Sequence, residues 1–465
     1  MDLVARALRL IPPDSPEAGH LLSRYILVLG LEEGDYRGAM QAYDGALAIA
    51  HRTGDAALEM RTLAHFSVVD YWHLRSQGTV TKGLRAIELA RRAGDQMSEV
   101  RTRFWVAVSQ LGIGESREAQ IHASAMLSLA ERLHDRYWLA TALWLNERVS
   151  MYKGDWHAAR EFSERGLLES TSDPRLLATR MIIEHESGNK FQGQLFLERL
   201  LEAVRLLTSE PRHDYASTAS MVPIAARITG DTEYLNMAEG AASTVLSAET
   251  ATPLVASLAR LGLALIAVLR SDAHGAKEQY ASLGSITGSY FIGLSVDRVL
   301  GLLAQTMGDS EQAVTHFENC MAGCRNAGYR PELAWACHDY ANMLLADERG
   351  RAPLQDDRAK AFSLIEEALA ISTDLGMAPL RERVEALQDR ANLGTVRVPA
   401  YPGGMTQREV EVLTQLAQGK TDREIARELV ISDRTVQRHV SNIYAKIKVR
   451  NRAEATTFAL NHLST

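Results

Sequence analysis

"GDYRGAMQAYDGALAIAHRTGD", residues 34–55, carries the pattern that decides the fold. A glycine followed by an acid opens the stretch, and small residues then recur with larger apolar ones at the spacing of an amphipathic helix. The same theme returns along the chain as "GESREAQIHASAMLSLAERLHD" (114–135), "GDWHAAREFSERGLLES" (154–170) and "GDSEQAVTHFENCMAGCRNAG" (308–328). The chain from about residue 20 to 390 is therefore a repeat of related helices.

The repeat has a period of about forty residues. Second helices such as "EMRTLAHFSVVDYWHL" (59–74) and "LAWACHDYANMLLA" (333–346) lie between the glycine-led ones, and alternating β-branched runs are nearly absent. We expect helix pairs, no strands, and an all-α solenoid. The glycines predicted at the turns are Gly34, Gly78, Gly114, Gly154, Gly188, Gly230 and Gly308.

The small residues of one helix, as in Ala313, Phe317 and Cys320, resemble those of tetratricopeptide repeats, although this unit is longer than the regular one of about 34 residues. Such an array buries a continuous core and is expected to leave its concave surface free. Surfaces of that kind bind peptides, proteins or small effectors, and the sequence does not choose among them.

Composition indicates a cytoplasmic protein without a membrane partner. Three cysteines in 465 residues do not suggest a disulfide framework. Arg6 and Arg9 interrupt the first apolar residues, which argues against a signal peptide. The most apolar run, "LGLALIAVLR" (261–270), is too short to span a bilayer.

The repeats are expected to end within "RAKAFSLIEEALAISTDLGMAPLRERVEAL" (358–387). "GTVRVPAYPGG" (394–404) concentrates glycine and proline without a helical period, which indicates a linker. We therefore predict a helical-repeat region at 1–393, a linker at 394–404 and a separate domain at 405–465.

The last sixty residues contain four helix signals. Thr406 with Glu409 and Thr421 with Glu424 form capping boxes, and Gly419 ends the first helix. Ser432 or Asp433 caps the third helix, and the fourth runs from about Arg452 to His462. The apolar stripe of the third helix is Val436, Val440, Ile443 and Ile447.

The opposite side of that third helix carries hydrogen-bond donors and small residues, as suits insertion into a DNA major groove. Residues 420–452 hold nine basic and four acidic side chains, a local +5 in a chain of net charge −7, and such a patch favours a polyanion. Arg438 is expected to contact bases, and Lys420, Lys446, Lys448 and Arg450 are expected to lie near phosphates. The predicted double-stranded DNA interface is Lys420, Thr421, Arg434, Thr435, Gln437, Arg438, Ser441, Asn442, Lys446 and Lys448.

This segment resembles the LuxR-type helix-turn-helix domain of bacterial transcription regulators. It carries "TQREVEVL", "EIARELVIS", "TVQRHVSNIYAKI" and V-x-N-R-A-E-A in the family's order. Gln437 stands where the family often has Lys, so no base preference carries over. The resemblance also implies a homodimer through the last helix, on which Ala455, Phe458, Ala459 and His462 form an apolar face.

The repeats resemble the helical region of large LuxR regulators that also have an N-terminal ATPase domain. This chain is expected to open inside a first repeat, without that domain. "GKT" at 419–421 lacks the first glycine of a phosphate loop, because Thr414 stands there. It is expected to be a helix end followed by a cap.

His316, Cys320 and Cys324 lie on one helical face, so a metal or redox site is one interpretation and core packing the other. The six tryptophans (Trp72, Trp105, Trp138, Trp144, Trp156 and Trp335) are expected either to pack between repeats or to line an effector pocket. Core packing is the favoured interpretation of His316, Cys320 and Cys324, so no metal site is predicted, and no pattern indicates an enzyme or a cofactor. The favoured function is a sequence-specific transcription regulator, and the alternative is an interaction scaffold with an accessory DNA-binding module.

Overall fold

The computed structural model describes residues 2–205, 213–346, 355–393, 405, 407–429 and 431–462. The chain divides into two compact units, unit 1 at Met1–Leu387 and unit 2 at Gln388–Thr465. The predicted linker, 394–404, lies outside the described residues, so the boundary at residue 393 stays a prediction.

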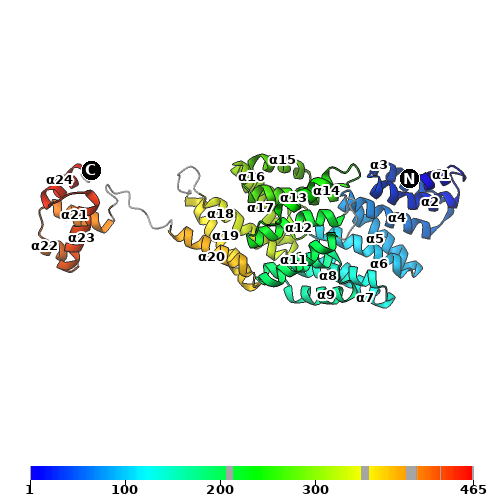
Figure 1. The fold of residues 1–465 in the computed structure, drawn as a ribbon, viewed down its shortest axis with the longest axis horizontal. Coiled ribbons are helices and arrows are strands. Elements are labelled where there is room, and N and C mark those ends of the chain that lie inside the picture. Colours follow the sequence, from blue (N-terminus) through cyan, green and yellow to red (C-terminus); the bar gives the residue numbers. More distant parts are fainter. Residues whose placement is uncertain are drawn as a thin grey trace. The chain divides into compact units, whose positions relative to one another are not determined.

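Unit 1 is an all-α array of antiparallel helix pairs, as the repeat predicts (Figure 1). Its first half contains α1 (Asp2–Leu8), α2 (Pro16–Leu27), the π-helical turn η1 (Val28–Glu32), α3 (Tyr36–Thr53), α4 (Ala56–Trp72), α5 (Ser76–Ala93), α6 (Gln96–Gly112), α7 (Ser116–Leu133), α8 (Arg136–Lys153), α9 (Trp156–Glu169) and α10 (Pro174–Glu186).

The second half contains α11 (Lys190–Arg205), α12 (His213–Thr229), α13 (Leu235–Leu246), α14 (Pro253–Leu269), α15 (Ala273–Leu283), the 3₁₀ turn η2 (Gly284–Ile286), β1 (Tyr290–Phe291), β2 (Leu294–Ser295), α16 (Val296–Met307), α17 (Ser310–Ala327), α18 (Arg330–Leu344), α19 (Gln355–Asp374) and α20 (Ala378–Leu393), which extends past the unit boundary. None of the described helices is both long and apolar enough to cross a membrane.

The glycine–acid pairs join successive helices. Gly54 ends α3 in the left-handed conformation, at φ +69°, which a side chain rarely adopts. Asp55 then caps α4 by accepting the backbone N–H of Leu58 at 2.8 Å. The same joint recurs at Gly154–Asp155 and Gly308–Asp309. One glycine therefore stops a helix while the next residue starts its partner.

Six of the seven predicted turn glycines have positive φ: Gly34, Gly114, Gly154, Gly188, Gly230 and Gly308. The prediction for Gly78 was wrong. Gly78 lies in the first turn of α5, where a Cβ would stand 2.4 Å from the Asp70 carboxylate, so it is there for close packing.

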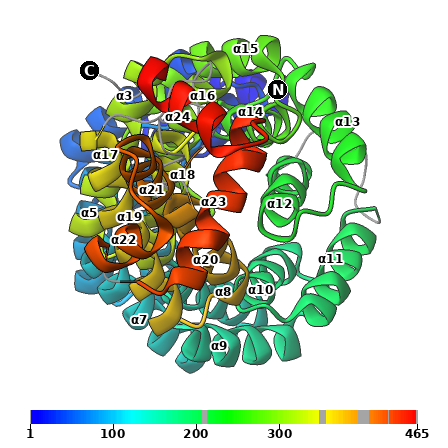
Figure 2. The same cartoon turned by 90° about the vertical axis from the view of Figure 1, so that its left-hand side faces the viewer.

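The helices form an outer and an inner layer about the axis of unit 1. In the end-on view, α7, α9, α11 and α13 lie outside α8, α10 and α12 (Figure 2). Burial agrees, since 11 of the 13 residues of α10 are buried but only 4 of the 14 residues of α9. Inner-layer side chains therefore face either the core or the axis.

The repeat pattern alone suggested an open inner surface, but part of this surface is covered. The later helices return against the earlier ones: the Tyr329 hydroxyl donates to the Leu111 carbonyl at 2.8 Å, and the Trp156 indole N–H donates to the Leu375 carbonyl at 2.7 Å. Residues some 220 positions apart thus meet, and the expected free concave surface is partly covered by the chain itself.

A short hairpin also departs from the sequence prediction, which expected no strands. β1 and β2 pair antiparallel, Tyr290 with Ser295 and Phe291 with Leu294. The two-residue turn is Ile292–Gly293, with φ of +55° and +84°. Two-residue strands are too short to show alternation, and Ile is unusual at such a turn position, so neither signal was visible in the sequence.

The cysteines pack in the core of unit 1. Cys320, Cys324 and Cys337 are free and buried, with Cys320 and Cys324 sulfurs 3.9 Å apart. Both ring nitrogens of His316 contact other side chains, Asp297 at 3.1 Å and the Tyr280 hydroxyl at 3.0 Å. In the described part of the chain, no three His, Cys, Asp or Glu side chains are arranged to hold a metal.

Candidate nucleic-acid interface

Unit 2 contains α21 (Gln407–Ala417), α22 (Asp422–Glu428), α23 (Asp433–Ile447) and α24 (Arg452–His462). The four helices surround one core, formed by Met405, Val412, Leu413, Leu416, Ile425, Ala426, Val436, Ile443, Ala455 and Ala459. We call these four helices the module. Its core is separate from that of unit 1.

Caps fix the helices of the module. Gly419, at φ +83°, follows α21. Thr421 and Glu424 form the predicted capping box of α22: the carboxylate of Glu424 accepts the backbone N–H of Thr421 at 2.7 Å. Ser432, not Asp433, caps α23 by accepting the N–H of Thr435 at 3.2 Å. The predicted cap at Thr406 falls on a residue outside the described ones.

Two faces divide α23 as the sequence predicts. Val436 and Ile443 are fully buried, and Val440 and Ile447 pack beside them. The opposite face exposes Gln437, Arg438, Ser441, Asn442 and Ala445 to solvent. Arg434 lies in the first turn of the same helix, and its side chain lies outside the described part of the structure.

The exposed face combines an arginine, two amides and a hydroxyl around a small residue. Arg and Gln donate in pairs to base edges, and Ala lets a helix approach closely. α22 and α23, joined by a short turn at Ile431–Ser432, form a helix-turn-helix in which α23 is the second helix.

Several basic side chains of the module are held by neighbouring acids. Lys446 Nζ lies 2.7 Å from Glu409 on α21, whose side chain is 5% exposed, and Lys420 Nζ lies 2.6 Å from Glu428. The further pairs are Arg408–Glu411, Arg423–Asp433 and Arg452–Asp422. Lys446 and Lys420 thus tie helices together, in addition to any contact with DNA.

The remaining basic side chains have no acid partner among the described residues. They are Arg427, Arg438, Lys448 and Arg450. Arg427 was not among the predicted interface residues. The sequence contained one signal for Arg427: Glu424, the acid three residues before it, is already used by the capping box at Thr421.

Two predicted residues have structural contacts of their own. Thr421 caps α22, and the Thr435 and Ser432 hydroxyl oxygens are 2.7 Å apart at the start of α23. Lys448 ends α23 in the left-handed conformation, at φ +57°. The structure therefore places Arg438, Gln437, Ser441 and Asn442 on one free face, and Thr421, Lys420 and Lys448 at helix ends.

The apolar face predicted on α24 is only partly exposed. Ala455 and Ala459 are buried in the core of their own module, so they are not free to meet another chain. Phe458 is half-buried and stacks on His462, with ring centroids 4.3 Å apart. Leu460 is the large apolar side chain of α24 that is exposed, at 60%.

A family model and several curated relatives match the module. Residues 404–459 fit the family described as "Bacterial regulatory proteins, luxR family". The uncharacterized transcriptional regulatory protein YhcZ of Bacillus subtilis is 48% identical over 58 residues, which is 12% of this chain and 27% of YhcZ. The transcriptional regulatory protein LiaR of B. subtilis is 45% identical over 60 residues, 13% of this chain and 28% of LiaR.

The CsgBAC operon transcriptional regulatory protein of Escherichia coli is 44% identical over 59 residues, 13% of this chain and 27% of that protein. The chain thus spans little more than a quarter of the length of these relatives. Among solved structures, yeast Tom70 aligns with 96% of this chain and 95% of its own, at 16% identity and a TM-score of 0.27.

Proposed function

We propose that this chain, whose residues 404–459 are a LuxR-family helix-turn-helix domain, is a transcription regulator that binds promoter DNA in a sequence-specific way. The observation that carries the proposal is the exposed face of α23, where Arg438 has no acid partner among the described residues. A guanidinium that no acid of the described residues holds is available for a base edge. The alternative, an interaction scaffold with an accessory module, lacks an observation of this kind.

Within the proposed interface, Arg438, Gln437, Ser441 and Asn442 contact bases, together with Arg434 and Thr435 from the first turn of α23. Phosphate contacts come from Lys448, Arg427 and Arg450, which have no acid partner in the described part of the chain. Thr421, at the N-cap of α22, contacts a phosphate beside them. Lys420 and Lys446 bind phosphate only in exchange for Glu428 and Glu409.

The protein acts as a homodimer on double-stranded DNA in this proposal. One module covers few base pairs, and a two-fold pair supplies the affinity and specificity that a single module lacks. Exposed Leu460 on α24 supports a contact there, in place of the buried Ala455 and Ala459. The protein is cytoplasmic, and unit 1 senses an effector or a partner protein.

Binding to fragments of bacterial genomic DNA tests the proposal. The full chain should select a set of fragments that share an inverted repeat, and a chain that ends at residue 393 should select none. Arg438→Ala should lose the preference for the selected fragments. Equal retention of all fragments by the full chain, or selection that survives the truncation, would leave the scaffold as the better function.

A further inference from the structure

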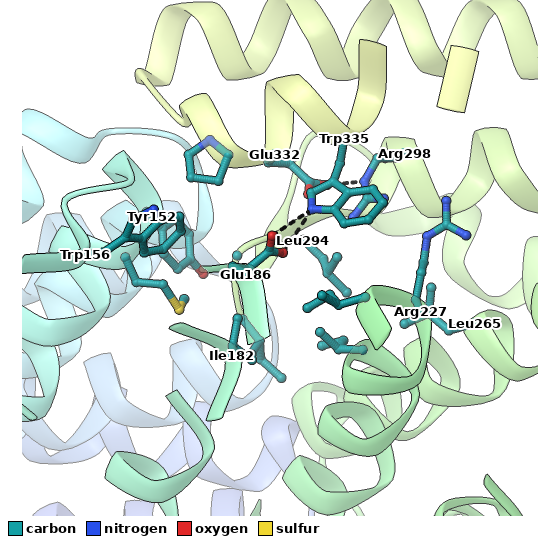
Figure 3. A pocket seen from close by; sticks show the side chains of 16 residues that line it. Tyr152, Trp156, Ile182, Glu186, Arg227, Leu265, Leu294, Arg298, Glu332 and Trp335 are labelled. Carbon is teal, nitrogen blue, oxygen red and sulfur yellow. Dashed lines mark hydrogen bonds and ion pairs between the residues drawn. The ribbon is translucent and has the colours of Figure 1, made fainter. Parts of the chain in front are cut away.

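A cavity lies between the inner helices of unit 1, far along the chain from the module. It has a volume of about 50 Å³, several times the ~10–15 Å³ that one water molecule needs. Its walls come from α8, the start of α9, α10, α12, α14, the β1–β2 hairpin, α16 and α18 (Figure 3). Elements that span residues 151–335 thus converge on one small space.

The hairpin closes the cavity on one side. Ile292, Gly293 and Leu294 all line it, and Ile292 also lines a neighbouring cavity beside Trp144. Ile292 has φ +55°, a conformation that costs a β-branched residue free energy and persists only where the surroundings impose it. The wall is therefore held in a shape that the local sequence does not favour.

One carboxyl and one indole meet across the space. The Trp335 indole N–H donates to both carboxylate oxygens of Glu186, at 2.9 and 3.1 Å (Figure 3). Burial raises the pKa of Glu186 to about 7. The rest of the lining is mostly apolar, including Ile182, Ile224 and Leu265.

The charged groups around Trp335 are rich in guanidinium. Arg298 pairs with Glu332 at 2.8 Å and with Asp339 at 3.0 Å, and Arg227 pairs with Asp339 at 2.5 Å. Arg383 lies over the Trp335 ring, 5.5 Å from its centroid. Three guanidinium groups thus lie near the carboxyl groups of Glu332, Asp339 and Glu186. Protonation of Glu186 removes one negative charge from this cluster.

One donor of this cluster is unused. Arg227 lines the cavity, its side chain is 13% exposed, and its Nε–H has no acceptor among the described residues. A buried donor without an acceptor costs free energy until something accepts its hydrogen bond. An oxygen acceptor in the cavity would remove that cost.

We propose that this cavity binds a small carboxylate with a short apolar body, whose carboxylate accepts from Arg227 while its apolar end packs against Ile182, Ile224 and Leu265. The inference rests on the proposed function in one respect, that unit 1 is the sensing part of a regulator. Binding is strongest when Glu186 is protonated, because an ionised Glu186 repels the carboxylate of the ligand.

A cationic ligand is the opposite possibility, since Trp156, Tyr152 and Trp335 surround an acid, as in sites that bind ammonium groups. The Trp335 face is already occupied by cations. Arg227, Arg298 and Arg383 all lie within 5.9 Å of its centroid. A further positive charge there would be repelled, so the three guanidinium groups favour the anion.

The test compares three probes with the same tail: butyrate, butan-1-ol and butylammonium. Binding to the full chain is followed by calorimetry and by tryptophan fluorescence at constant ionic strength, because Trp156 and Trp335 line the cavity. Butyrate should bind more tightly than either of the others. Its affinity should fall about tenfold from pH 6 to pH 8, because one unit above the pKa about a tenth of the Glu186 side chains stay protonated.

Other charged and titratable groups near Glu186 are Arg227, Arg298, Glu332, His338, Asp339 and Arg383, so the pH effect needs its own variant. Glu186→Gln keeps an acceptor for Trp335 and should bind butyrate about equally at pH 6 and pH 8. Arg227→Lys keeps the charge but loses the Nε–H, and should bind butyrate about tenfold more weakly. Arg325→Lys, at an exposed site on α17, is the matched control and should bind as the parent does.

Three results would overturn the proposal: no butyrate binding, butylammonium binding as tight as butyrate, or an unchanged pH dependence in Glu186→Gln. Thermal unfolding of each variant shows whether it folds. The readout does not involve DNA, so the two proposals fail separately. Butyrate binding without fragment selection would refute the regulator and keep the cavity site. Fragment selection without butyrate binding would keep the regulator and refute the cavity site.

Discussion

The arginines of the inner layer of unit 1 and those of α22 and α23 differ in what they contact. Arg298 is 3% exposed and holds two carboxylates that are themselves 3–4% exposed. Arg438 is exposed and has no acid partner among the described residues. Guanidinium groups are expensive to bury without partners and cheap to leave in water. Arg298 therefore stabilises the fold of unit 1, whereas Arg438 of the module is available to a ligand.

The largest expected effect of this difference is on the stability of unit 1. Arg298→Ala leaves Glu332 and Asp339 buried without their shared partner, which should cost about 3–5 kcal/mol of unfolding free energy. The measurement is chemical unfolding of the full chain.

Arg325→Ala is the control for that experiment. It breaks a pair with Glu367 whose side chains are 48% and 32% exposed, and should cost at most about 1 kcal/mol. Equal losses in the two variants would mean that burial does not separate the two kinds of arginine.

A second effect concerns pH. Burial raises the pKa of Glu186 from 4.5 to about 7, so its contribution to stability is complete below pH 4.5 and is lost as the pH rises through about 7. Glu186→Gln does not ionise, and should be more stable than the parent at pH 8 by up to about 3 kcal/mol. Thermal unfolding at pH 5 and pH 8 measures the difference, which should be small at pH 5. A gain of the same size at both values would show that ionisation is not its cause.

The third effect falls on DNA affinity and leaves stability unchanged. Arg438→Ala should weaken binding to a selected site by about 1–3 kcal/mol and relax preference at one base position. Titration of selected and scrambled DNA measures both. Arg165→Ala, an exposed arginine on α9, should change neither. A uniform loss on both DNAs would assign Arg438 to phosphate and shift base reading to Gln437.

The sequence predicted the local structure well because the deciding signals are local. Glycine–acid joints, the capping box at Thr421 and the stripe Val436, Val440 and Ile443 each depend on residues a few positions apart. The return of Tyr329 to Leu111 depends on the accumulated rotation of many repeats, which no short pattern encodes. The cavity at Trp335 could not be predicted for the same reason, although lining an effector pocket was one of the two roles expected for the tryptophans.

For the interface, the sequence predicted which side chains face outward. It did not predict which basic side chains lack an acidic partner. In a helical projection, Arg438 and Lys446 both lie outside the apolar stripe of α23. Only the packing of α21 against α23 brings the buried carboxylate of Glu409 to Lys446. The same limit explains the error on α24, where Ala455 and Ala459 fit an outer face or a core equally well.

The fourth effect separates a cap from a contact. Thr421→Ala removes the hydroxyl that accepts the backbone N–H of Glu424, and should cost about 1 kcal/mol of module stability. Thr421→Ser keeps the hydroxyl and should restore it. Unfolding of the module, followed by far-ultraviolet dichroism, measures both. If Thr421→Ala weakens DNA binding without loss of stability, the residue is mainly a contact.

The smallest effect compares two lysines at the end of α23. Lys448 lacks an acid partner among the described residues, so Lys448→Asn should lower the slope of log affinity against log salt by about one phosphate contact. Asn tolerates the left-handed conformation that Lys448 adopts, so stability should change little.

Lys446→Gln should have the opposite effect, because the ammonium group of Lys446 is held by Glu409 at 2.7 Å. The stability of the module should fall, and the slope of log affinity against log salt should not change. Fluorescence titrations at several salt concentrations give both slopes. A lower slope in Lys446→Gln would mean that this ion pair opens on DNA and gives its lysine to a phosphate. The charges of the module would then be less fixed than those around Arg298, because the Lys446 side chain is 36% exposed and that of Arg298 only 3%.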